Sequence, residues 1–224
     1  MSQKYEEHII ASWNQNAGAW ITAIQKEEIA SRIAVTNQII IDTVLEQKPK
    51  KVLDLGCGEG WLTRALVASG LDVLGVDVVP ELVDAASSHG IGRFQVVSYE
   101  GLADGALAEK FDLIVCNFSL FGEESVKQLF GCLHELLLPN GRIVIQTLHP
   151  HAKFIGQEYK DAWRQGSWQG FNSQFTNPAP WYFRTLETWK RLFQENQIDL
   201  SDTIEPINPA TQDYASIVFV GKIY

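Results

Sequence analysis

The sequence predicts an α/β fold in which a seven-stranded, mostly parallel sheet is covered by helices on both faces. Between residues 51 and 148, short strands that are apolar almost throughout alternate with helical segments, a pattern typical of a parallel sheet buried on both sides. Near the end of the chain, a loop of about nine residues separates two strand-like segments. Such a loop is too short for a crossover helix, so this pair is expected to be antiparallel.

The elements follow from periodicity and from the residues that interrupt it. Residues 1–47 are expected to be helical because apolar residues such as Ile33, Ile40 and Val44 recur at helical spacing, and Pro49 ends this region. Strands are expected at 52–55, 72–77, 94–98, 111–118, 142–148, 198–204 and 214–224, and the intervening helices at 61–69, 80–88, 124–137 and 185–196. We expect one domain, 1–224, with a helical lid at 1–47 and an insertion at 149–184.

Composition excludes several classes of protein. The net charge of −9, with 18 basic residues that form no run, argues against a general nucleic-acid binder. No apolar run is long enough to span a bilayer and no signal-peptide pattern opens the chain, so a cytoplasmic protein without a membrane partner is expected. Three widely spaced cysteines indicate reduced thiols, and the scattered histidines predict no metal site.

The most informative segment is a glycine-rich turn between the first strand and the helix after it, Asp54-Leu55-Gly56-Cys57-Gly58-Glu59-Gly60. Glycines allow a tight bend and a close approach of a ligand, and the N-terminus of the following helix offers unpaired N–H groups. Asp77 ends the second strand 21 residues after Gly56, where a carboxylate can accept both hydroxyls of a ribose. The alternative is a glycine turn with no ligand.

Two features distinguish the possible nucleotide ligands. The dinucleotide pattern Gly-x-Gly-x-x-Gly needs glycine where Trp61 stands. Asp54 and Glu59 would repel a pyrophosphate and attract the sulfonium and ammonium groups of S-adenosylmethionine. The pattern therefore favours the methyl donor over NAD.

These motifs resemble those of class I S-adenosylmethionine-dependent methyltransferases, in particular the small-molecule enzymes of the type 11 and type 12 groups. The resemblance runs from about residue 51 to 147, through 52–61, Gly75-Val76-Asp77, 97–102, 111–117 and Leu138-Pro139-Asn140-Gly141-Arg142. It implies the Rossmann-like fold of that class, with strand order 3-2-1-4-5-7-6 and strand 7 antiparallel.

The resemblance also implies where the donor, and its product S-adenosylhomocysteine, would bind. Asp54 and the loop Gly56, Cys57 and Gly58 would surround the methionine part, and Asp77 would hold the ribose with Val78 beside the adenine. The remaining implied contacts are Ser98, Tyr99 and Glu100 along the adenine edge, and Asn117 and Phe118 beside the sulfonium. Many relatives carry Asp where Ser98 stands, which leaves that contact less defined.

The acceptor is expected to be a small molecule, apolar or aromatic in part. Enzymes that methylate DNA bases carry an Asn/Asp-Pro-Pro-Tyr/Phe motif where this chain has Asn117-Phe118-Ser119-Leu120. The insertion 149–184 is dense in aromatic residues, which either cover the acceptor or only attach a long loop to the sheet. They are Phe154, Tyr159, Trp163, Trp168, Phe171, Phe175, Trp181, Tyr182 and Phe183.

Several other side chains are candidates for roles near the acceptor. His149 follows the fifth strand and is either a general base or the cap of a loop. Trp181, Tyr182 and Arg184 lie in a segment that resembles the edge of the acceptor pocket in small-molecule enzymes, and Arg184 pairs with either an acidic acceptor or a surface carboxylate. Trp13, Asn16 and Trp20 either fold over the donor or simply pack the N-terminal helix.

Three alternatives to a small-molecule methyltransferase remain open at this point. A protein side-chain methyltransferase would have an open groove for its acceptor that is acidic or polar rather than lined by aromatic residues. A non-catalytic domain would bind S-adenosylmethionine or S-adenosylhomocysteine without transferring a methyl group. An NAD-dependent oxidoreductase is disfavoured by Trp61 and Asp54. The sequence defines neither the acceptor atom nor the oligomeric state.

Overall fold

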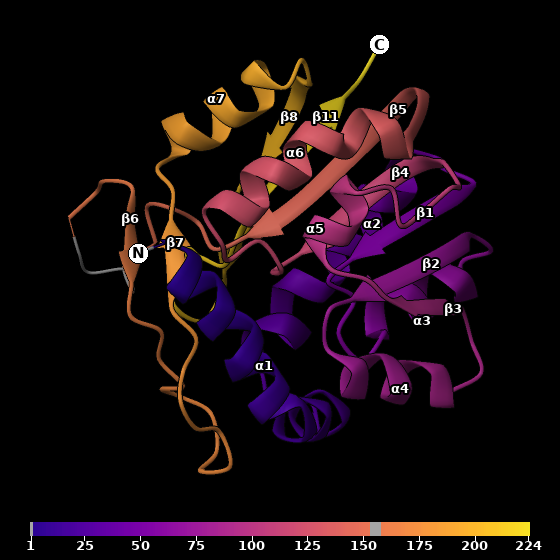
Figure 1. Ribbon diagram of the computed structural model, residues 1–224. Helices are drawn as coiled ribbons and strands as arrows, with labels where there is room; N and C mark the ends of the chain where they lie inside the picture. Colours follow the sequence, from indigo (N-terminus) through magenta and orange to yellow (C-terminus); the bar gives the residue numbers. More distant parts are fainter. Residues whose placement is uncertain (1, 153–157) are drawn as a thin grey trace.

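A seven-stranded sheet forms the centre of the protein, for which the computed structural model describes residues 2–152 and 158–224 (Figure 1). In spatial order its strands are β3 (Arg93–Val96), β2 (Asp72–Asp77), β1 (Lys51–Leu55), β4 (Phe111–Asn117), β5 (Leu137–Thr147), β11 (Ile217–Lys222) and β8 (Asp199–Ile204). The first five are parallel, and β11 is antiparallel to both of its neighbours. The expected strand order and the antiparallel last strand are confirmed.

Helices cover both faces of this sheet. On one face, α2 (Asn37–Glu46) and α3 (Trp61–Ala68) bury Ile40, Leu62 and Leu66 against the inward side chains of the central strands. On the other face lie α5 (Tyr99–Ala103), α6 (Glu124–Leu136) and α7 (Leu186–Glu195), which contribute Phe130 and Phe193 to the larger core. The continuous apolar strands of the sequence are therefore buried from both sides, as a parallel sheet requires.

The N-terminal region is helical in three pieces. Helix α1 (Ser2–Gln25) ends before Glu27, which has a φ of +54°, and is followed by the π-helical turn η1 (Arg32–Thr36) and then by α2. α1 packs on α4 (Pro80–Ser88) through Ala17 and Leu82. In Figure 1, α1 and the orange segment that carries β6 and β7 lie at the arrowhead end of the central strands.

Local hydrogen bonds explain where the observed elements differ from the expected ones. The third strand ends at Val96 rather than 98, because the Ser98 hydroxyl accepts a hydrogen bond from Gly101 N and caps α5, a helix that periodicity did not predict. The last strand starts at Ile217 rather than 214, because residues 213–214 form β10 (Asp213–Tyr214), which pairs with β9 (Ile207–Asn208). Within the insertion, β6 (Ala162–Arg164) pairs with β7 (Trp181–Phe183).

Among the residues that the structure describes, no helix is long and apolar enough to cross a membrane.

Candidate active site: a roofed pocket at the carboxyl ends of the strands

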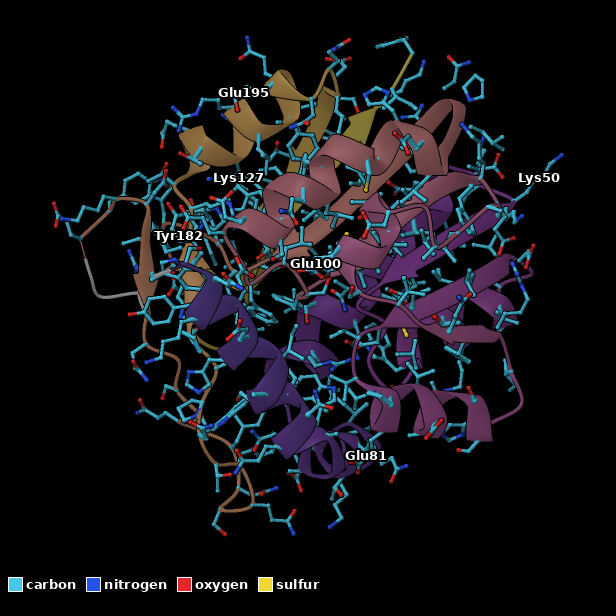
Figure 2. All side chains as sticks on the ribbon, viewed as in Figure 1. Lys50, Glu81, Glu100, Lys127, Tyr182 and Glu195 are labelled. Carbon is cyan, nitrogen blue, oxygen red and sulfur yellow. The ribbon has the colours of Figure 1, made fainter. Side chains whose placement is uncertain are left out.

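A pocket of about 730 Å³ lies where the central parallel strands end, the usual location of ligand sites in open α/β sheets. Its inner wall consists of lining residues from the loops that follow β1 to β4, together with Trp20, Arg32 and Trp61. Its outer wall consists of lining residues from the first half of α1, the loop after Phe118, the insertion and the β9–β10 hairpin. Figure 2 labels Glu100 of the inner wall near the centre of the view and Tyr182 within the insertion.

The glycine loop is held rigidly by its own backbone. The N–H groups of Gly56 and Cys57 both donate to Val76 O, at 2.8 and 3.0 Å. Gly56 has a φ of +71°, and a Cβ at this position would overlap the side chain of Ser119, whose hydroxyl donates to Leu55 O. Both the backbone conformation and the lack of space therefore require glycine here.

Asp77 organises the loop as well as facing the pocket. Its Oδ2 accepts from Gly58 N and its Oδ1 from Val79 N, each at 2.9 Å. Burial raises the pKa of Asp77, and these backbone hydrogen bonds oppose the rise because they favour the carboxylate. The second strand thus ends in a carboxylate that is fixed in orientation and lines the pocket, as the sequence predicts.

Asp54 and Glu59, whose charges were expected to face the ligand, lie behind the loop and are not among the described lining residues. The buried Asp54 accepts from the Thr63 hydroxyl at 2.8 Å, and desolvation raises its pKa to about 7. Glu59 accepts from Trp61 N and forms an ion pair with Arg64. Asp54 and Glu59 therefore stabilise the turn, and among the described lining residues Asp77 and Glu100 are the carboxylates of the inner wall.

The expected donor-binding residues other than Asp54 all line this pocket: Gly56, Cys57, Gly58, Asp77, Val78, Ser98, Tyr99, Glu100, Asn117 and Phe118. Asn117 Oδ1 is buried without a hydrogen-bond partner in the described structure, although Asn117 lies at the end of β4 against the pocket. A buried polar atom without a partner is costly in a folded protein, so this oxygen is suited to a donor group of a ligand. The Tyr99 hydroxyl donates to Ser119 O at 3.3 Å, and burial raises its pKa.

Arg32 is a feature of the inner wall that sequence reasoning missed. Its guanidinium lies over the rings of Trp61 and Trp20, at 4.6 and 5.7 Å from their centroids, and Nε donates to Asn37 Oδ1. Burial lowers the pKa of Arg32 to about 10, so the group stays cationic at neutral pH. An arginine on a helical segment outside the glycine motif gives no sequence signal for this role.

The outer wall is a set of aromatic rings around Trp13. The Trp13 ring lies 5.2 Å from Trp20 and 5.8 Å from Trp168, both edge to face, and 5.9 Å from Phe121. Of the expected aromatics of the insertion, Trp168, Phe171 and Trp181 line the pocket. Trp163 instead stacks on Tyr5, while Phe154 lies outside the described residues.

Asn16 joins α1 to the insertion and does not contact the pocket. Its side chain is 1% exposed, donates to Thr176 O at 2.8 Å and accepts from Thr176 N at 2.9 Å. Ser12 donates to Asn177 O at 2.6 Å, one turn before Asn16 on the same helix. The two segments that roof the pocket are thus hydrogen-bonded to each other.

The structure places His149 outside the pocket walls that it describes. His149 is 1% exposed, its Nε2 lies 2.9 Å from Glu205 Oε1, and its Nδ1 accepts from His151 N. Its ring stacks on Tyr214 at 3.7 Å between centroids. Since both ring nitrogens are engaged, the geometry favours the capping alternative over the general base.

Arg184 is buried and donates hydrogen bonds to backbone carbonyl oxygens. It is 3% exposed and donates to Gly122 O and Glu123 O, at 2.6 and 3.0 Å. With Tyr182 it lines a separate cavity of about 20 Å³ next to the pocket, about the size needed for one water molecule. The surface-carboxylate alternative does not hold, because the guanidinium is buried and binds the turn before α6.

Metal binding and disulfide chemistry have no visible basis in the described parts of the chain. Residues 2–152 and 158–224 contain no cluster of three or more His, Cys, Asp or Glu side chains placed to hold a metal ion. Cys57, Cys116 and Cys132 are buried free thiols, and desolvation raises the pKa of each.

Together, the fold and the pocket define a Rossmann-like nucleoside-binding protein of the methyltransferase type. The chain belongs to the methyltransferase domain family, whose model matches residues 28–201.

Curated relatives share part of the chain. It is 29% identical over 135 residues to the ubiquinone biosynthesis O-methyltransferase of Ralstonia nicotianae, a match covering 55% of this chain and 57% of that protein. It is 34% identical over 122 residues to the enzyme of the same name from Psychrobacter arcticus, covering 49% and 47%. The chain thus spans about half the length of the curated relatives it matches.

Solved structures extend the likeness of fold over almost the whole chain. The 1,6-didemethyltoxoflavin-N1-methyltransferase of Burkholderia thailandensis, with 1,6-didemethyltoxoflavin and S-adenosylhomocysteine bound, aligns with a TM-score of 0.69 at 18% identity, covering 100% of this chain and 90% of that one. The magnesium protoporphyrin IX methyltransferase of Synechocystis PCC 6803, with bound SAH, also gives 0.69, at 16% identity, covering 98% and 100%. At such identities these likenesses show the fold.

Proposed function

We propose that this protein transfers a methyl group from S-adenosylmethionine to a small molecule. The observation that carries the proposal is the inner wall, where a glycine loop that excludes a Cβ and the fixed carboxylate of Asp77 line one pocket. Asn117 Oδ1, which has no hydrogen-bond partner among the described residues, lies at the same wall. Relatives and structural neighbours named as methyltransferases of small molecules support a small-molecule acceptor over a protein side chain.

In this proposal each part of the donor has a matching group. Asp77 accepts the ribose hydroxyls with the lone pairs that Gly58 and Val79 leave unused, and Val78 and residues 98–100 border the adenine. Asn117 Oδ1 faces the ammonium or sulfonium end. Arg32 is the cation of the inner wall among the described lining residues, and we assign it to the donor's carboxylate.

The protein's contribution to the reaction is mainly positional. The bound donor supplies a methyl carbon already activated by a positive sulfur. The inner wall holds that carbon at a fixed place, while the aromatic outer wall excludes water and orients the acceptor. No proton transfer is assigned to His149, because it lies behind Tyr214. Proximity of this kind accounts for up to ~7–11 kcal/mol of a barrier.

The proposal also extends to organisation and location. Residues 1–224 act as one domain in which α1 and the described part of the insertion 149–184 form a joint roof, and the hydrogen bonds between Asn16 and Thr176 support this. The rest of the expected lid, α2, instead covers a face of the sheet. Three buried free thiols agree with a reducing compartment, and we propose the cytoplasm.

Calorimetry tests the cofactor. S-adenosylmethionine and S-adenosylhomocysteine should bind with one site each, and NAD should not. The isosteric variant Asp77→Asn should weaken both ligands at least tenfold, whereas Asp84→Asn on the exposed face of α4 should leave them unchanged. Preferential binding of NAD would contradict the proposed cofactor and with it the proposed function. If S-adenosylmethionine binds but no member of a metabolite library is methylated, only the non-catalytic alternative would remain.

A further inference from the structure

The inner wall contains an apolar region beside the ends of β2 and β3. The order β3-β2-β1 places the loop after β3 on one side of Asp77 and the glycine loop after β1 on the other. Val78, Leu82 and Val97, from the chain that follows β2 and β3, line the pocket here. Because the proposed function places the charged amino-acid part of the donor at the glycine loop and Arg32, the apolar region is left for the flat base of the nucleoside.

Three residues with polar side chains, Ser98, Tyr99 and Glu100, follow β3 and line the same part of the pocket. Ser98 Oγ accepts from Gly101 N at 3.1 Å and so caps α5. The Tyr99 hydroxyl donates to Ser119 O at 3.3 Å, which joins α5 to the turn after β4. Two of the three polar side chains are therefore already engaged in holding this part of the wall together.

Glu100 differs from both of these neighbours. It is an exposed residue on the first turn of α5, and its carboxylate has no hydrogen-bond or ion-pair partner within the part of the chain that the structure describes. In contrast, both oxygens of Asp77 are bonded, to Gly58 N and Val79 N. An ionised carboxylate only accepts hydrogen bonds, so Glu100 is suited to an N–H group at the edge of a bound base.

We propose that Glu100 accepts a hydrogen bond from the exocyclic amino group of the donor's adenine, and so selects adenine over purines that lack this group. This inference rests on the proposed function and adds a specificity-determining residue to it. A hydrogen bond to a carboxylate is stronger than one to a neutral acceptor, because the charge assists it. A base with an oxygen in place of the amino group would meet the carboxylate as acceptor against acceptor, which is unfavourable.

Calorimetry with three ligands that differ only in the base tests this role. They are S-adenosylhomocysteine, its analogue with hydrogen in place of the amino group, and S-inosylhomocysteine, which carries an oxygen there. Glu100→Leu should weaken S-adenosylhomocysteine about fivefold and the desamino analogue less than about twofold, since only the first has N–H groups at that position. Glu100→Gln keeps a neutral acceptor and should show a smaller loss, while its amide N–H should improve the binding of S-inosylhomocysteine several-fold over wild type.

Two further variants separate this contact from general damage. Asp104→Asn, on an exposed residue after α5, should change the affinity for none of the three ligands. Ser98→Ala removes the cap of α5 and should weaken S-adenosylhomocysteine and the desamino analogue by the same factor.

Equal losses for these two ligands in Glu100→Leu, or a loss specific to the amino ligand in Ser98→Ala, would overturn the inference and leave the proposed function standing. A failure of S-adenosylhomocysteine to bind the wild-type protein would overturn the proposed function and this inference with it, so the two failures are distinguishable.

Discussion

The two walls of the pocket are built on different principles. The inner wall is centred on a loop that backbone hydrogen bonds hold in place: Gly56 and Cys57 share one acceptor, Val76 O, and Gly58 is bonded to the carboxylate of Asp77. The outer wall is side chain: rings such as Trp13 and Phe121 meet at centroid distances of 5 to 6 Å. A loop fixed by its own backbone keeps one conformation, whereas a wall of rings can be rebuilt for a new ligand by changing a few residues.

The two walls are therefore suited to different ligands of the same pocket. The inner wall consists mainly of consecutive residues at strand ends, and it suits a ligand that does not vary. The outer wall joins four segments that are far apart in the chain, where specificity is more easily changed. Changes to the inner wall should therefore affect donor binding, and changes to the outer wall should affect the roof and the acceptor.

The largest effect is expected from Gly56→Ala. A methyl group there meets Ser119 and would have to adopt a φ of +71°, so the loop must shift and S-adenosylhomocysteine affinity should fall at least ~100-fold. The matched control is Gly105→Ala, which has a similar φ of +80° but open space around its Cβ. Calorimetry should show the loss of affinity for Gly56→Ala only. Equal losses for both variants would show that backbone strain alone, and not the contact with Ser119, lowers the affinity.

Arg32→Met should reduce affinity for S-adenosylhomocysteine by about tenfold, or ~1.4 kcal/mol, because a charge-assisted bond to its carboxylate is lost. Affinity for 5′-methylthioadenosine, which lacks that carboxylate, should not change. Arg191→Met on exposed α7 is the control. Equal losses for both ligands would show that Arg32 only packs between Trp20 and Trp61.

The inner wall was predictable from the sequence because its signals are local. Glycines 56 and 58 and the acid at 77 stand at fixed distances from strand ends, and the fold places strand ends together. Asp54 was expected to face the ligand and does not. The reason is that alternation along β1 turns its side chain toward Thr63, away from the ligand. The glycine loop therefore lies at the expected site, although its acids Asp54 and Glu59 do not line the pocket.

For the outer wall, the sequence predicted an aromatic cover but not the residues that form it. Aromatic density in the insertion indicated a cover, but which rings face the pocket depends on contacts with α1, such as Trp13 with Trp168. Arg32 and the short β9–β10 hairpin carry no periodic signal, and their places follow from tertiary packing. His149 satisfied the sequence criterion of following the fifth strand, yet Tyr214 stacks between it and the pocket.

Asn16→Ala should loosen the roof and leave the inner wall intact. The change removes the hydrogen bonds to Thr176 N and O, at an expected cost of about 1–3 kcal/mol in the free energy of unfolding. Hydrogen exchange should accelerate in peptides covering 165–180 and stay constant in those covering 52–61. Asn14→Ala, exposed on the same helix, is the control. Equal acceleration in both peptides would contradict the separation of the two walls.

The smallest effect on ligand binding is expected from Asp54→Asn, which tests whether this acid belongs to the scaffold behind the inner wall. Burial raises the pKa of Asp54 from its ordinary value of 3.8 to about 7. Between these values the unfolded chain has released the proton and the folded protein retains it, so the free energy of unfolding falls as pH rises from about 4 to about 7. Above pH 7 this contribution is constant, because both states are ionised.

Asn removes that titration while its Oδ1 can still accept from the Thr63 hydroxyl. Compared with wild type, the variant should be more stable at pH 8, on the order of 2–4 kcal/mol, and the difference should vanish near pH 4. Urea unfolding across this range measures it, with Asp84→Asn on the surface of α4 as the control. Affinity for S-adenosylhomocysteine should change less than about twofold, since Asp54 does not line the pocket. A tenfold loss of affinity would show that Asp54 contacts the ligand, and would contradict its assignment to the scaffold behind the inner wall.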